Sequence, residues 1–504
     1  MTERLKSKMV LQKNPLLNIK NLKIQTNGGG DGIVRSLSFH IHAGEIVGIA
    51  GESGSGKSMT ALSVMRLLPE SVRMEAQEVI FDGKDLSGIS EKEYENLRGS
   101  ELAMIFQEPM TSLNPVQRIG GQVEEVLLLH GKQSKEERKA AALAAMQEAG
   151  LSNAEELFLR YPHELSGGQR QRVMIAMAML GTPKLLIADE PTTALDADTE
   201  EQILLLLKNL SQKHQMAVLF ISHNLYAVRQ LCDRVLIMKD GELIEEGTAE
   251  EVFAAPKEAY TKRLLASVPS GKKAVEEKQT PGEALLQVEH LNVYYKNKKD
   301  QKQVIFDSSF SVFEGEIVGL VGESGNGKTT LIKTIAGFHS LYDGVIRRKP
   351  KGVRLQMVFQ DPYSSLNPAK KIGWLLEEPL RLQTKLKAAE RKERALQMLA
   401  AVELPAAYYD RYISELSGGQ RQRVAIAVAL IQKPQLVLLD EPVSALDVTV
   451  QAQILELLLR LQKEYRLTYL FISHDRNVIR RLCDRVLFMK NGTVQEIEET
   501  TLFS

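Results

Sequence analysis

The stretch Glu45-Ile-Val-Gly-Ile-Ala-Gly-Glu-Ser-Gly-Ser-Gly-Lys-Ser58 decides the fold, and Glu316-Ile-Val-Gly-Leu-Val-Gly-Glu-Ser-Gly-Asn-Gly-Lys-Thr329 repeats it. In both, a short apolar run leads into a glycine-rich turn of the form GxxxxGK[ST], the pattern of a phosphate-binding loop that precedes a helix. Glycines let successive backbone N–H groups surround phosphate oxygens at a helix N-terminus. One copy could be an ordinary glycine-rich turn, but two copies in the same context predict two nucleotide-binding α/β domains.

Each loop supplies three kinds of ligand group. Lys57 and Lys328 are expected to contact the terminal phosphates, and Ser58 and Thr329 to ligate Mg²⁺. The loop residues expected to line the phosphates are Gly51, Ser53, Gly54 and Gly56 in the first copy and Gly322, Ser324, Gly325 and Gly327 in the second.

An internal repeat organises the chain. Residues 164–173 (ELSGGQRQRV) recur unchanged as residues 415–424, an offset of 415 − 164 = 251. The same offset relates Asp189 to Asp440 and His223 to His474, so the chain is a duplication.

The repeat predicts four segments: a tail (1–13), a first domain (14–268), a linker (269–284) rich in Pro, Gly and charge, and a second domain (285–504). Between the phosphate loop and Gln360 the offset falls from 328 − 57 = 271 to 360 − 107 = 253. The second copy has therefore lost 18 residues (271 − 253), and we expect a trimmed hairpin or loop there.

Composition limits the function classes. The 504 residues are 43% hydrophobic, with 64 basic and 64 acidic side chains, so no global charge favours a nucleic-acid partner. No apolar run reaches the roughly 18 residues that a membrane-spanning helix needs, and no secretory signal is recognisable, so any membrane role is expected to be peripheral. Two cysteines, Cys232 and Cys483, predict a reducing, cytoplasmic setting without a disulfide framework or a cysteine-ligated metal or iron–sulfur site.

Further apolar runs complete the α/β pattern in both copies. Residues 184–188, 218–221, 435–439 and 469–472 are candidate buried strands. Between Gln107 and Ser166 the pattern changes to Ala-, Glu-, Leu- and Lys-rich stretches with helical spacing, which predicts an inserted helical subdomain.

Two acidic pairs end apolar strands, Asp189-Glu190 and Asp440-Glu441. An Asp at a strand end beside a phosphate loop can hold Mg²⁺, usually through water, and the next carboxylate can polarise the attacking water. A single pair is usually a solvated strand end, but its recurrence behind a phosphate loop favours a catalytic role for Glu190 and Glu441.

With Leu165-Ser-Gly-Gly-Gln169 and Leu416-Ser-Gly-Gly-Gln420, both copies resemble the nucleotide-binding domains of ATP-binding cassette proteins. The resemblance implies ATP and Mg²⁺ as cofactors, and two domains that sandwich two ATP molecules head to tail. Lys57 would then share a site with Ser417, and Lys328 with Ser166, within one chain or by exchange between two chains. The signature residues that would bind the γ-phosphate are Ser166, Gly167, Gly168 and Gln169, and Ser417, Gly418, Gly419 and Gln420.

The remaining landmarks follow in the order that the family has them. The alternative for the glutamines is a polar strand terminus, and a lone histidine after a strand is more often structural. Gln107 and Gln360 match the loop that senses the γ-phosphate, contributes to the Mg²⁺ site and touches the membrane subunits. Asp196 and Asp447 match the loop that communicates across the dimer. His223 and His474 match the switch histidine that contacts the γ-phosphate and helps to orient the water.

One landmark differs between the copies. Tyr295, in Val-Tyr-Tyr-Lys, matches the aromatic residue that stacks on adenine, and base–aromatic stacking contributes about 1–3 kcal/mol in nucleic-acid complexes. The corresponding stretch of the first copy, residues 24–30, has no aromatic residue. We therefore expect weaker adenine contact at the first site.

Residues 106–115 and 359–368 are similar to the ATPases of oligopeptide, dipeptide and nickel importers. The implied function is ATP hydrolysis at the cytoplasmic face of the cell membrane. It would drive uptake of peptides, nickel or metal-chelate and opine-like solutes through two permease subunits, supplied by an extracytoplasmic binding protein.

The alternative is a tandem cassette ATPase that acts on ribosomes or DNA. Ribosome-acting relatives usually have a long charged helical tether, whereas this linker is short and contains Pro281. DNA-repair relatives insert cysteine zinc modules, which two cysteines cannot supply. A regulatory module without turnover conflicts with retention of both glutamates.

Overall fold

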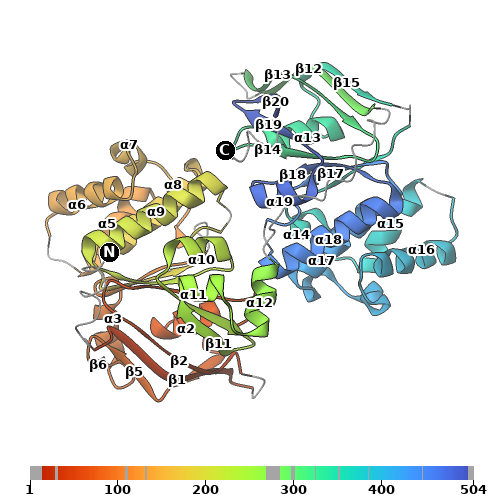
Figure 1. Cartoon of the computed structure of the whole chain (residues 1–504). Helices are drawn as coiled ribbons and strands as arrows, with labels where there is room; N and C mark the ends of the chain where they lie inside the picture. The colour runs from red at the N-terminus through yellow and green to blue at the C-terminus, as the bar shows by residue number, and fades with distance from the viewer. Residues whose placement is uncertain are drawn as a thin grey trace. The chain divides into compact units, whose positions relative to one another are not determined.

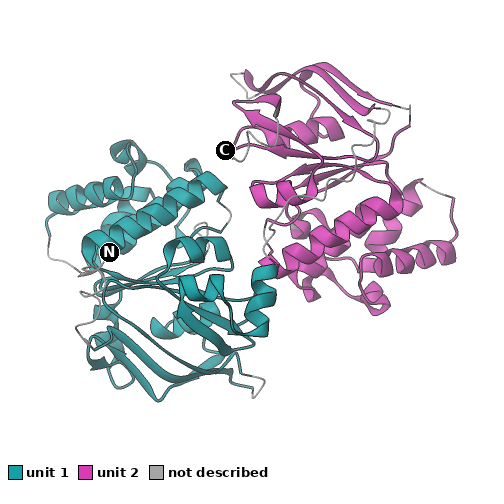
Figure 2. Ribbon diagram, in the orientation of Figure 1, with its two compact units in different colours: residues 1–266 teal, residues 267–504 magenta. Residues whose placement is uncertain are grey.

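The structure is a computed structural model, and it describes residues 14–28, 32–107, 112–130, 133–193, 195–267, 284–296, 301–323, 325–349, 352–383, 385–444 and 446–497. Two compact units, residues 1–266 and 267–504, divide the chain (Figure 2). The predicted tail and nearly all of the predicted linker lie outside the described residues. Within the described residues, no helix has the length and apolar character needed to cross a bilayer.

Unit 1 combines a large sheet with helices (Figure 1). Its strands are β1 (Leu17–Thr26), β2 (Val34–Ile41), β3 (Ile46–Ala50), β4 (Val72–Glu75), β5 (Glu78–Phe81), β6 (Lys84–Asp85), β7 (Leu102–Ile105), β8 (Leu185–Asp189), β9 (Ala217–Ile221), β10 (Arg234–Lys239) and β11 (Glu242–Thr248). Its helices are α2 (Lys57–Val64), α3 (Glu91–Leu97), α5 (Ile119–His130), α6 (Lys135–Glu148), α7 (Ala154–Phe158), η1 (Pro162–Glu164), α8 (Gly167–Met179), α9 (Ala197–His214), α10 (Leu225–Leu231), α11 (Ala249–Ala254) and α12 (Ala259–Ala266).

Unit 2 repeats this plan with fewer elements. Its strands are β12 (Ala284–Lys296), β13 (Gln301–Phe313), β14 (Ile317–Val321), β15 (Tyr342–Arg348), β16 (Leu355–Val358), β17 (Leu436–Asp440), β18 (Thr468–Ile472), β19 (Arg485–Lys490) and β20 (Thr493–Ile497). Its helices are α13 (Lys328–Ala336), α14 (Pro362–Ser365), α15 (Ile372–Gln383), α16 (Ala388–Ala401), η2 (Ala406–Asp410), η3 (Ile413–Glu415), α17 (Gly418–Leu430), α18 (Val448–Tyr465) and α19 (Arg476–Leu482).

The sheet of unit 1 is mixed, in the order β6-β5-β1-β2-β11-β10-β3-β9-β8-β7, with β4 paired to β1. Strands β10, β3, β9, β8 and β7 are mutually parallel, whereas β1 pairs antiparallel with β2, β4 and β5. Unit 2 has a parallel run β16-β17-β18-β14-β19 with antiparallel β20, and a separate three-stranded sheet β13-β12-β15. The predicted α/β class with a mixed sheet is confirmed.

The central strands are continuous apolar runs because both of their faces are covered. Every residue of β3, β8, β9, β14, β17 and β18 is buried. In β14, Ile317 and Val321 pack into the core shared with the helical subdomain, while Val318 and Leu320 pack with α13 and the antiparallel strands. One strand thereby serves two cores, which fixes the position of its carboxyl end.

Helices α5, α6 and α7 form the insertion expected between Gln107 and Ser166, and α8 follows it directly; the insertion lies at the end of the unit opposite β1, β2, β5 and β6 in Figure 1. The shortened region of unit 2 lacks elements that unit 1 has, as the shorter sequence predicted. Unit 1 carries β4, β5, β6 and α3 between its phosphate loop helix and β7, whereas unit 2 carries β15. The loss therefore removes a helix as well as the hairpin or loop that we expected.

Candidate active sites

The parallel strands bring the predicted motifs to one edge of each sheet. In unit 1, β3 is followed by the phosphate loop, β7 by Gln107, and β9 by His223, while β8 ends in Asp189. These four strands are neighbours in the order β3-β9-β8-β7. Ligands bind parallel α/β sheets at the carboxyl ends of the strands, so this edge is the candidate site. Unit 2 places its motifs likewise after β14, β16, β17 and β18.

The first glycine of each phosphate loop is required by its surroundings. Gly51 has φ 154°, and a Cβ built on it would lie 2.1 Å from the Met238 carbonyl oxygen. Gly322 has φ 157°, and its Cβ would lie 2.3 Å from the Met489 carbonyl oxygen. No side chain fits between the loop and the neighbouring strand. The other loop glycines, Gly54, Gly56, Gly325 and Gly327, also have positive φ, and Ser324 lies outside the described residues.

Both loop lysines point back into the turn that they close. Lys57 Nζ donates to the carbonyl oxygens of Gly51 and Glu52, at 2.8 Å each, and Lys328 Nζ donates to those of Gly322 and Glu323 at 2.6 and 2.9 Å. Both side chains are buried. The ammonium groups are therefore held at the mouths of the loops, beside α2 and α13.

A hydroxyl and a carboxylate meet behind each loop. Ser58 Oγ lies 3.0 Å from Asp189 Oδ1, and Thr329 Oγ1 lies 3.1 Å from Asp440 Oδ1. Burial raises the pKa of both aspartates to about 6; the adjacent glutamate charge adds to this and the hydroxyl bond opposes it. Hard oxygen donors of this kind fit Mg²⁺, which commonly takes one or two carboxylates together with substrate phosphates. The described residues contain no cluster of three His, Cys, Asp or Glu suited to a metal.

Three donors converge on one oxygen of Glu190. Its Oε2 accepts from Gln107 Nε2 at 2.9 Å and from Thr193 Oγ1 at 3.0 Å, and lies 3.1 Å from His223 Nδ1. The motif residues that follow β7 and β9, Gln107 and His223, are thereby joined to the candidate base, which follows β8.

Unit 2 repeats the cluster with one difference. Glu441 Oε2 lies 3.1 Å from Gln360 Nε2 and 3.2 Å from His474 Nδ1. Ser444, the counterpart of Thr193, instead donates to the backbone carbonyl of Glu441 at 3.1 Å. The sequence did not single out Thr193, because a hydroxyl two residues beyond a proline carries no signal of its partner.

Both glutamates have a left-handed backbone, with φ 47° at Glu190 and 45° at Glu441. Non-glycine residues in this region cost on the order of 1–3 kcal/mol and persist only where the surroundings hold them. Here the Glu190 N–H donates to the Ile221 carbonyl at 2.8 Å, and the Glu441 N–H to the Ile472 carbonyl at 3.2 Å. The bend turns each carboxylate out of the sheet toward the glutamine and the histidine.

The histidines also affect the charges of the clusters. Burial acts to raise the pKa of Glu190, but the hydrogen bond and charge of His223 outweigh it and hold that pKa below its usual value. Burial acts to lower the pKa of His474, but the contact with Glu441 outweighs it and raises that pKa. The lowered pKa of Glu190 favours the ionised form that a general base needs.

The signature residues form helix caps. Ser166 Oγ accepts from the Gln169 N–H at 3.2 Å while Gln169 Oε1 accepts from the Ser166 N–H at 3.0 Å, a capping box at the start of α8. Ser417 and Gln420 form the same box at α17. The glycines between them, Gly167, Gly168, Gly418 and Gly419, lie in the first turns of α8 and α17, where the backbone N–H groups have no helical partner.

The second signature glycine permits close helix packing. A Cβ on Gly168 would lie 2.6 Å from Thr199 Cγ2, and one on Gly419 would lie 2.3 Å from Val450 Cγ1. Asp196 and Asp447 cap the helices that carry these contacts, accepting from the N–H groups of Thr199 at 2.9 Å and Val450 at 3.0 Å. The sequence did not predict this capping role of the two aspartates.

Tyr295 lies beside the second phosphate loop helix. Its Oη is 3.3 Å from Thr330 Oγ1 on α13, its ring centroid is 4.7 Å from that of His339, and 43% of the residue is exposed. In unit 1, Asn27 follows β1 and donates to the Glu70 carbonyl at 2.7 Å. An aromatic face is therefore available next to α13, and the adenine contact itself stays a prediction.

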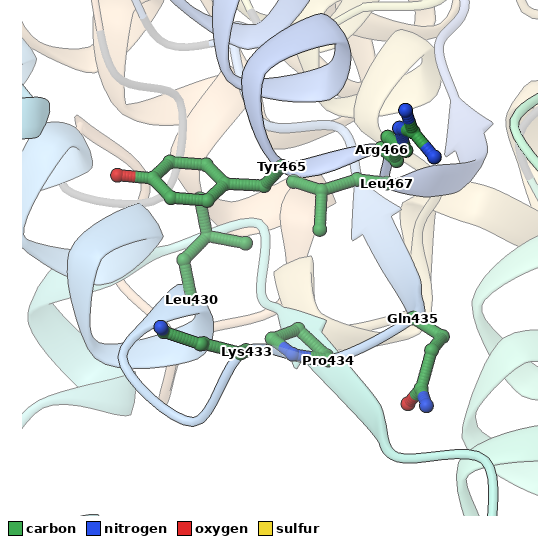
Figure 3. A pocket seen from close by; sticks show the side chains of 7 residues that line it. All are labelled: Leu430, Lys433, Pro434, Gln435, Tyr465, Arg466 and Leu467. Atoms are coloured by element: carbon green, nitrogen blue, oxygen red, sulfur yellow. The ribbon is translucent and has the colours of Figure 1, made fainter.

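A small cavity of about 160 Å³ lies elsewhere, lined by Leu430, Lys433, Pro434, Gln435, Tyr465, Arg466 and Leu467 (Figure 3). These residues precede β17 and β18, so the cavity is at the amino ends of the strands. It contains none of the predicted site residues.

Comparison with known proteins gives a consistent assignment. The family model described as ABC transporter matches residues 34–193 and 305–444. An uncharacterized ABC transporter ATP-binding protein, YejF of Escherichia coli K12, is 46% identical, with 92% of this chain and 91% of the relative covered. The peptidoglycan transport ATP-binding protein YejF of Agrobacterium fabrum is 43% identical, with coverages of 96% and 92%.

The glutathione import ATP-binding protein GsiA of Escherichia coli O157:H7 is 40% identical, with 92% of this chain and 82% of the relative covered. Among solved structures, an archaeal ribosome recycling factor in complex with a stalk protein has a TM-score of 0.62, covering 91% of this chain and 87% of that one. At 21% identity that likeness concerns the fold alone.

Proposed function

This chain belongs to the ABC transporter family as one of its ATP-binding subunits, with the ATPase activity general to that family, and we propose that it powers an importer of peptide-type solutes. The observation that carries the ATPase part of this proposal is the repetition of one complete cluster in both units, and the relatives named below support the import of peptide-type solutes. Each has a lysine-closed phosphate loop, a hydroxyl–carboxylate pair, and a glutamate joined to a glutamine and a histidine.

In this proposal each residue of the cluster has one role. The backbone N–H groups of the phosphate loops bind the β- and γ-phosphates of ATP, and Lys57 and Lys328 turn from the loop carbonyls to the phosphate oxygens. Glu190 and Glu441 orient and deprotonate the attacking water. Gln107, Gln360, His223 and His474 hold those carboxylates and contact the γ-phosphate.

The Ser58–Asp189 and Thr329–Asp440 pairs would hold Mg²⁺. When bound, the cation neutralises charge on the transferred phosphoryl group. Replacing the Ser58 or Thr329 hydroxyl removes one oxygen ligand and should raise the Mg²⁺ concentration needed for half-maximal hydrolysis.

We further propose that the two units pair head to tail, each unit presenting its signature helix to the phosphate loop of the other. The first turns of α8 and α17 offer unbonded N–H groups and a helix dipole to a γ-phosphate. A covalent link raises the effective concentration of one unit near the other, which favours pairing within a chain over exchange between chains.

The proposed partners are two integral membrane permeases, with an extracytoplasmic binding protein upstream, and the chain would act at the cytoplasmic face of the membrane. Relatives named for peptidoglycan transport and glutathione import support solutes that contain peptide bonds. Nickel, metal chelates and opine-like solutes are the wider range proposed from the resemblance. The names of these relatives do not favour the ribosome or DNA alternative.

Affinity purification of the full chain from detergent-solubilised membranes tests the proposal. We expect two permease subunits to copurify, and ATP hydrolysis by the complex to rise when a peptide-loaded binding protein is added. Copurification with ribosomes and no membrane protein would refute the transport function while leaving the ATPase intact.

A further inference from the structure

A carboxylate outside the known motifs joins two catalytic loops in unit 1. Glu200, in the first turn of α9, accepts a hydrogen bond through Oε1 from Thr192 Oγ1 at 2.9 Å. The same oxygen accepts from Asn224 Nδ2 at 2.8 Å. Thr192 is the second residue after the candidate base Glu190, and Asn224 directly follows His223. We refer to Thr192, Glu200 and Asn224 as the brace.

A helix cap positions one end of the brace, and burial constrains the other. Asn224 caps α10, because its Oδ1 accepts from the N–H groups of Tyr226 at 3.0 Å and Ala227 at 3.4 Å. That leaves the amide nitrogen to reach Glu200. Thr192 is 6% exposed, so its hydroxyl needs a partner within the protein.

The helix that carries Glu200 also meets two other motifs. Asp196 caps α9, and Thr199, the neighbour of Glu200, packs against signature Gly168. The brace therefore ties the segments after Glu190 and after His223 to the helix that packs against the signature.

Unit 2 lacks all three residue types. At the offset of 251 (443 − 192, 451 − 200, 475 − 224), Val443, Gln451 and Asp475 replace Thr192, Glu200 and Asn224. Val443 is buried and has no hydroxyl, and among the described residues no hydrogen bond joins Gln451 to Asp475. Asp475 still caps α19 through the N–H groups of Asn477 and Val478, so the cap is common to both units and the brace is not.

We propose that Glu200 is a positioning residue of the first site, which holds Glu190 and His223 in register through Thr192 and Asn224, and that the two sites therefore hydrolyse ATP unequally. The inference rests on the proposed roles of Glu190 and His223. The first site then has a tie between its two catalytic loops in addition to the contacts among glutamate, glutamine and histidine that both sites share. A misalignment of about 1 Å at a catalytic group can lower a rate about 10²-fold, so loss of such a tie acts on turnover more than on binding.

The test compares steady-state ATP hydrolysis by the full chain carrying E200Q or T192V, each of which introduces the residue type of unit 2. We expect kcat to fall roughly 5- to 20-fold with KM for ATP changed less than about twofold. E201Q is the matched control, since Glu201 is the exposed neighbour on the same helix and the charge change is identical. It should match the wild type.

Each variant is measured in the wild-type and E441Q backgrounds. If the sites turn over independently, E441Q leaves the first site as the one observed. If the two sites hydrolyse ATP in turn, the slower site limits the overall rate, so kcat in the wild-type background already reports that site.

The double variant E200Q/N224D gives unit 1 the residue pair of unit 2, Gln451 and Asp475, which no hydrogen bond joins among the described residues. We therefore expect no rescue: kcat should stay at or below that of E200Q, with KM for ATP still changed less than about twofold, which separates positioning from loss of the fold. The proposal would be overturned if E200Q and T192V both retained the kcat of the wild type. It would also be overturned if E200Q/N224D retained the kcat of the wild type.

Different experimental results would refute the proposed role of the brace and the proposed function. If E190Q/E441Q hydrolyses ATP like the wild type, the assigned bases are wrong. If that double variant is inactive while T192V and E200Q are fully active, the bases stand and the brace is wrong. Should E200Q not fold, T192V carries the test, because it replaces one hydroxyl by a methyl group of nearly equal volume.

Discussion

The Nδ1 atom of His223 lies 3.1 Å from Oε2 of Glu190, and His474 repeats this relationship with Glu441 at 3.2 Å. In both units the amide of a glutamine from a third strand end reaches the same oxygen. The candidate base and the histidine and glutamine proposed to contact the γ-phosphate thus form one hydrogen-bonded group. A change at any one of them is expected to alter the others.

The first prediction concerns the bases. E190Q or E441Q keeps the shape of the side chain and removes its basicity, so hydrolysis at that site should fall by about 10²–10⁴-fold while ATP binding is retained. Phosphate release measures the loss, and retention of labelled ATP on a filter measures the trapped state. An E190Q/E441Q chain with wild-type hydrolysis would show that another group activates the water.

The second prediction concerns the loop entrance. G51A places a methyl group 2.1 Å from the Met238 carbonyl oxygen, so the loop must shift away from β10 and its N–H groups lose their arrangement. We expect nucleotide binding at the first site to be lost and the free energy of unfolding to fall by about 1–3 kcal/mol. Equilibrium dialysis and urea denaturation measure the two effects. G88A is the control, because nothing lies within 4 Å of a Cβ at that position.

The sequence was sufficient for the fold and for the grouping of most of the candidate site residues, because strand–loop–helix motifs fix their own position at a sheet edge. Asp189 ends β8, and Gln107 and His223 follow the neighbouring parallel strands β7 and β9, so spacing along the chain translates into proximity. The helix α3 in the longer loop of unit 1 was not foreseen. Its capping box, Ser90 with Glu93, is a visible signal, but the residues before it read as a hairpin.

Which side chains contact one another could not be predicted from the sequence. Nothing in the pattern indicates that Glu190 and Glu441 have positive φ, since the strain follows from backbone bonds to the neighbouring strand. The brace combines residues from the segment after β8, from α9 and from the start of α10, and no local spacing connects them. Only the comparison of the two units shows that all three brace residues of unit 1 are replaced in unit 2.

The third prediction concerns the stability of unit 1 against acid. Glu45 accepts from Arg234 Nε and from the His42 N–H, both at 2.8 Å. Burial acts to raise the pKa of Glu45, but these bonds outweigh it and lower that pKa below its usual value. A carboxyl with a lowered pKa in the folded state stabilises the protein above its unfolded-state pKa, and this stabilisation is lost as the pH falls through the folded-state value.

E45Q should therefore cost about 2 kcal/mol of unfolding free energy near pH 7, and the difference from wild type should shrink below about pH 4. Urea denaturation at several pH values measures it. E95Q, at an exposed position of α3, should leave the pH dependence unchanged. A cost that is the same at pH 7 and at pH 3.5 would mean that the ionised carboxylate is not the stabilising form.

The last prediction concerns the unequal grip on adenine. The register of the strands makes Thr26 the counterpart of Tyr295. Ile24 pairs with Val34 in unit 1, and Val293 pairs with Ile305 in unit 2. Val34 and Ile305 differ by 271 in number (305 − 34) and Ile24 and Val293 by 269 (293 − 24), and the second offset also relates Thr26 to Tyr295. Y295A should weaken the tighter of two ATP-binding classes by roughly 5- to 150-fold, because it removes the ring that would stack on the base. Y295F is the matched control, since it keeps the ring and loses only the contact with Thr330. T26Y should strengthen the weaker class, and isothermal titration of the E190Q/E441Q chain resolves both. A wild-type-like titration for Y295A, or a single binding class in the parent, would show that adenine is held by other groups and that the two sites bind ATP alike.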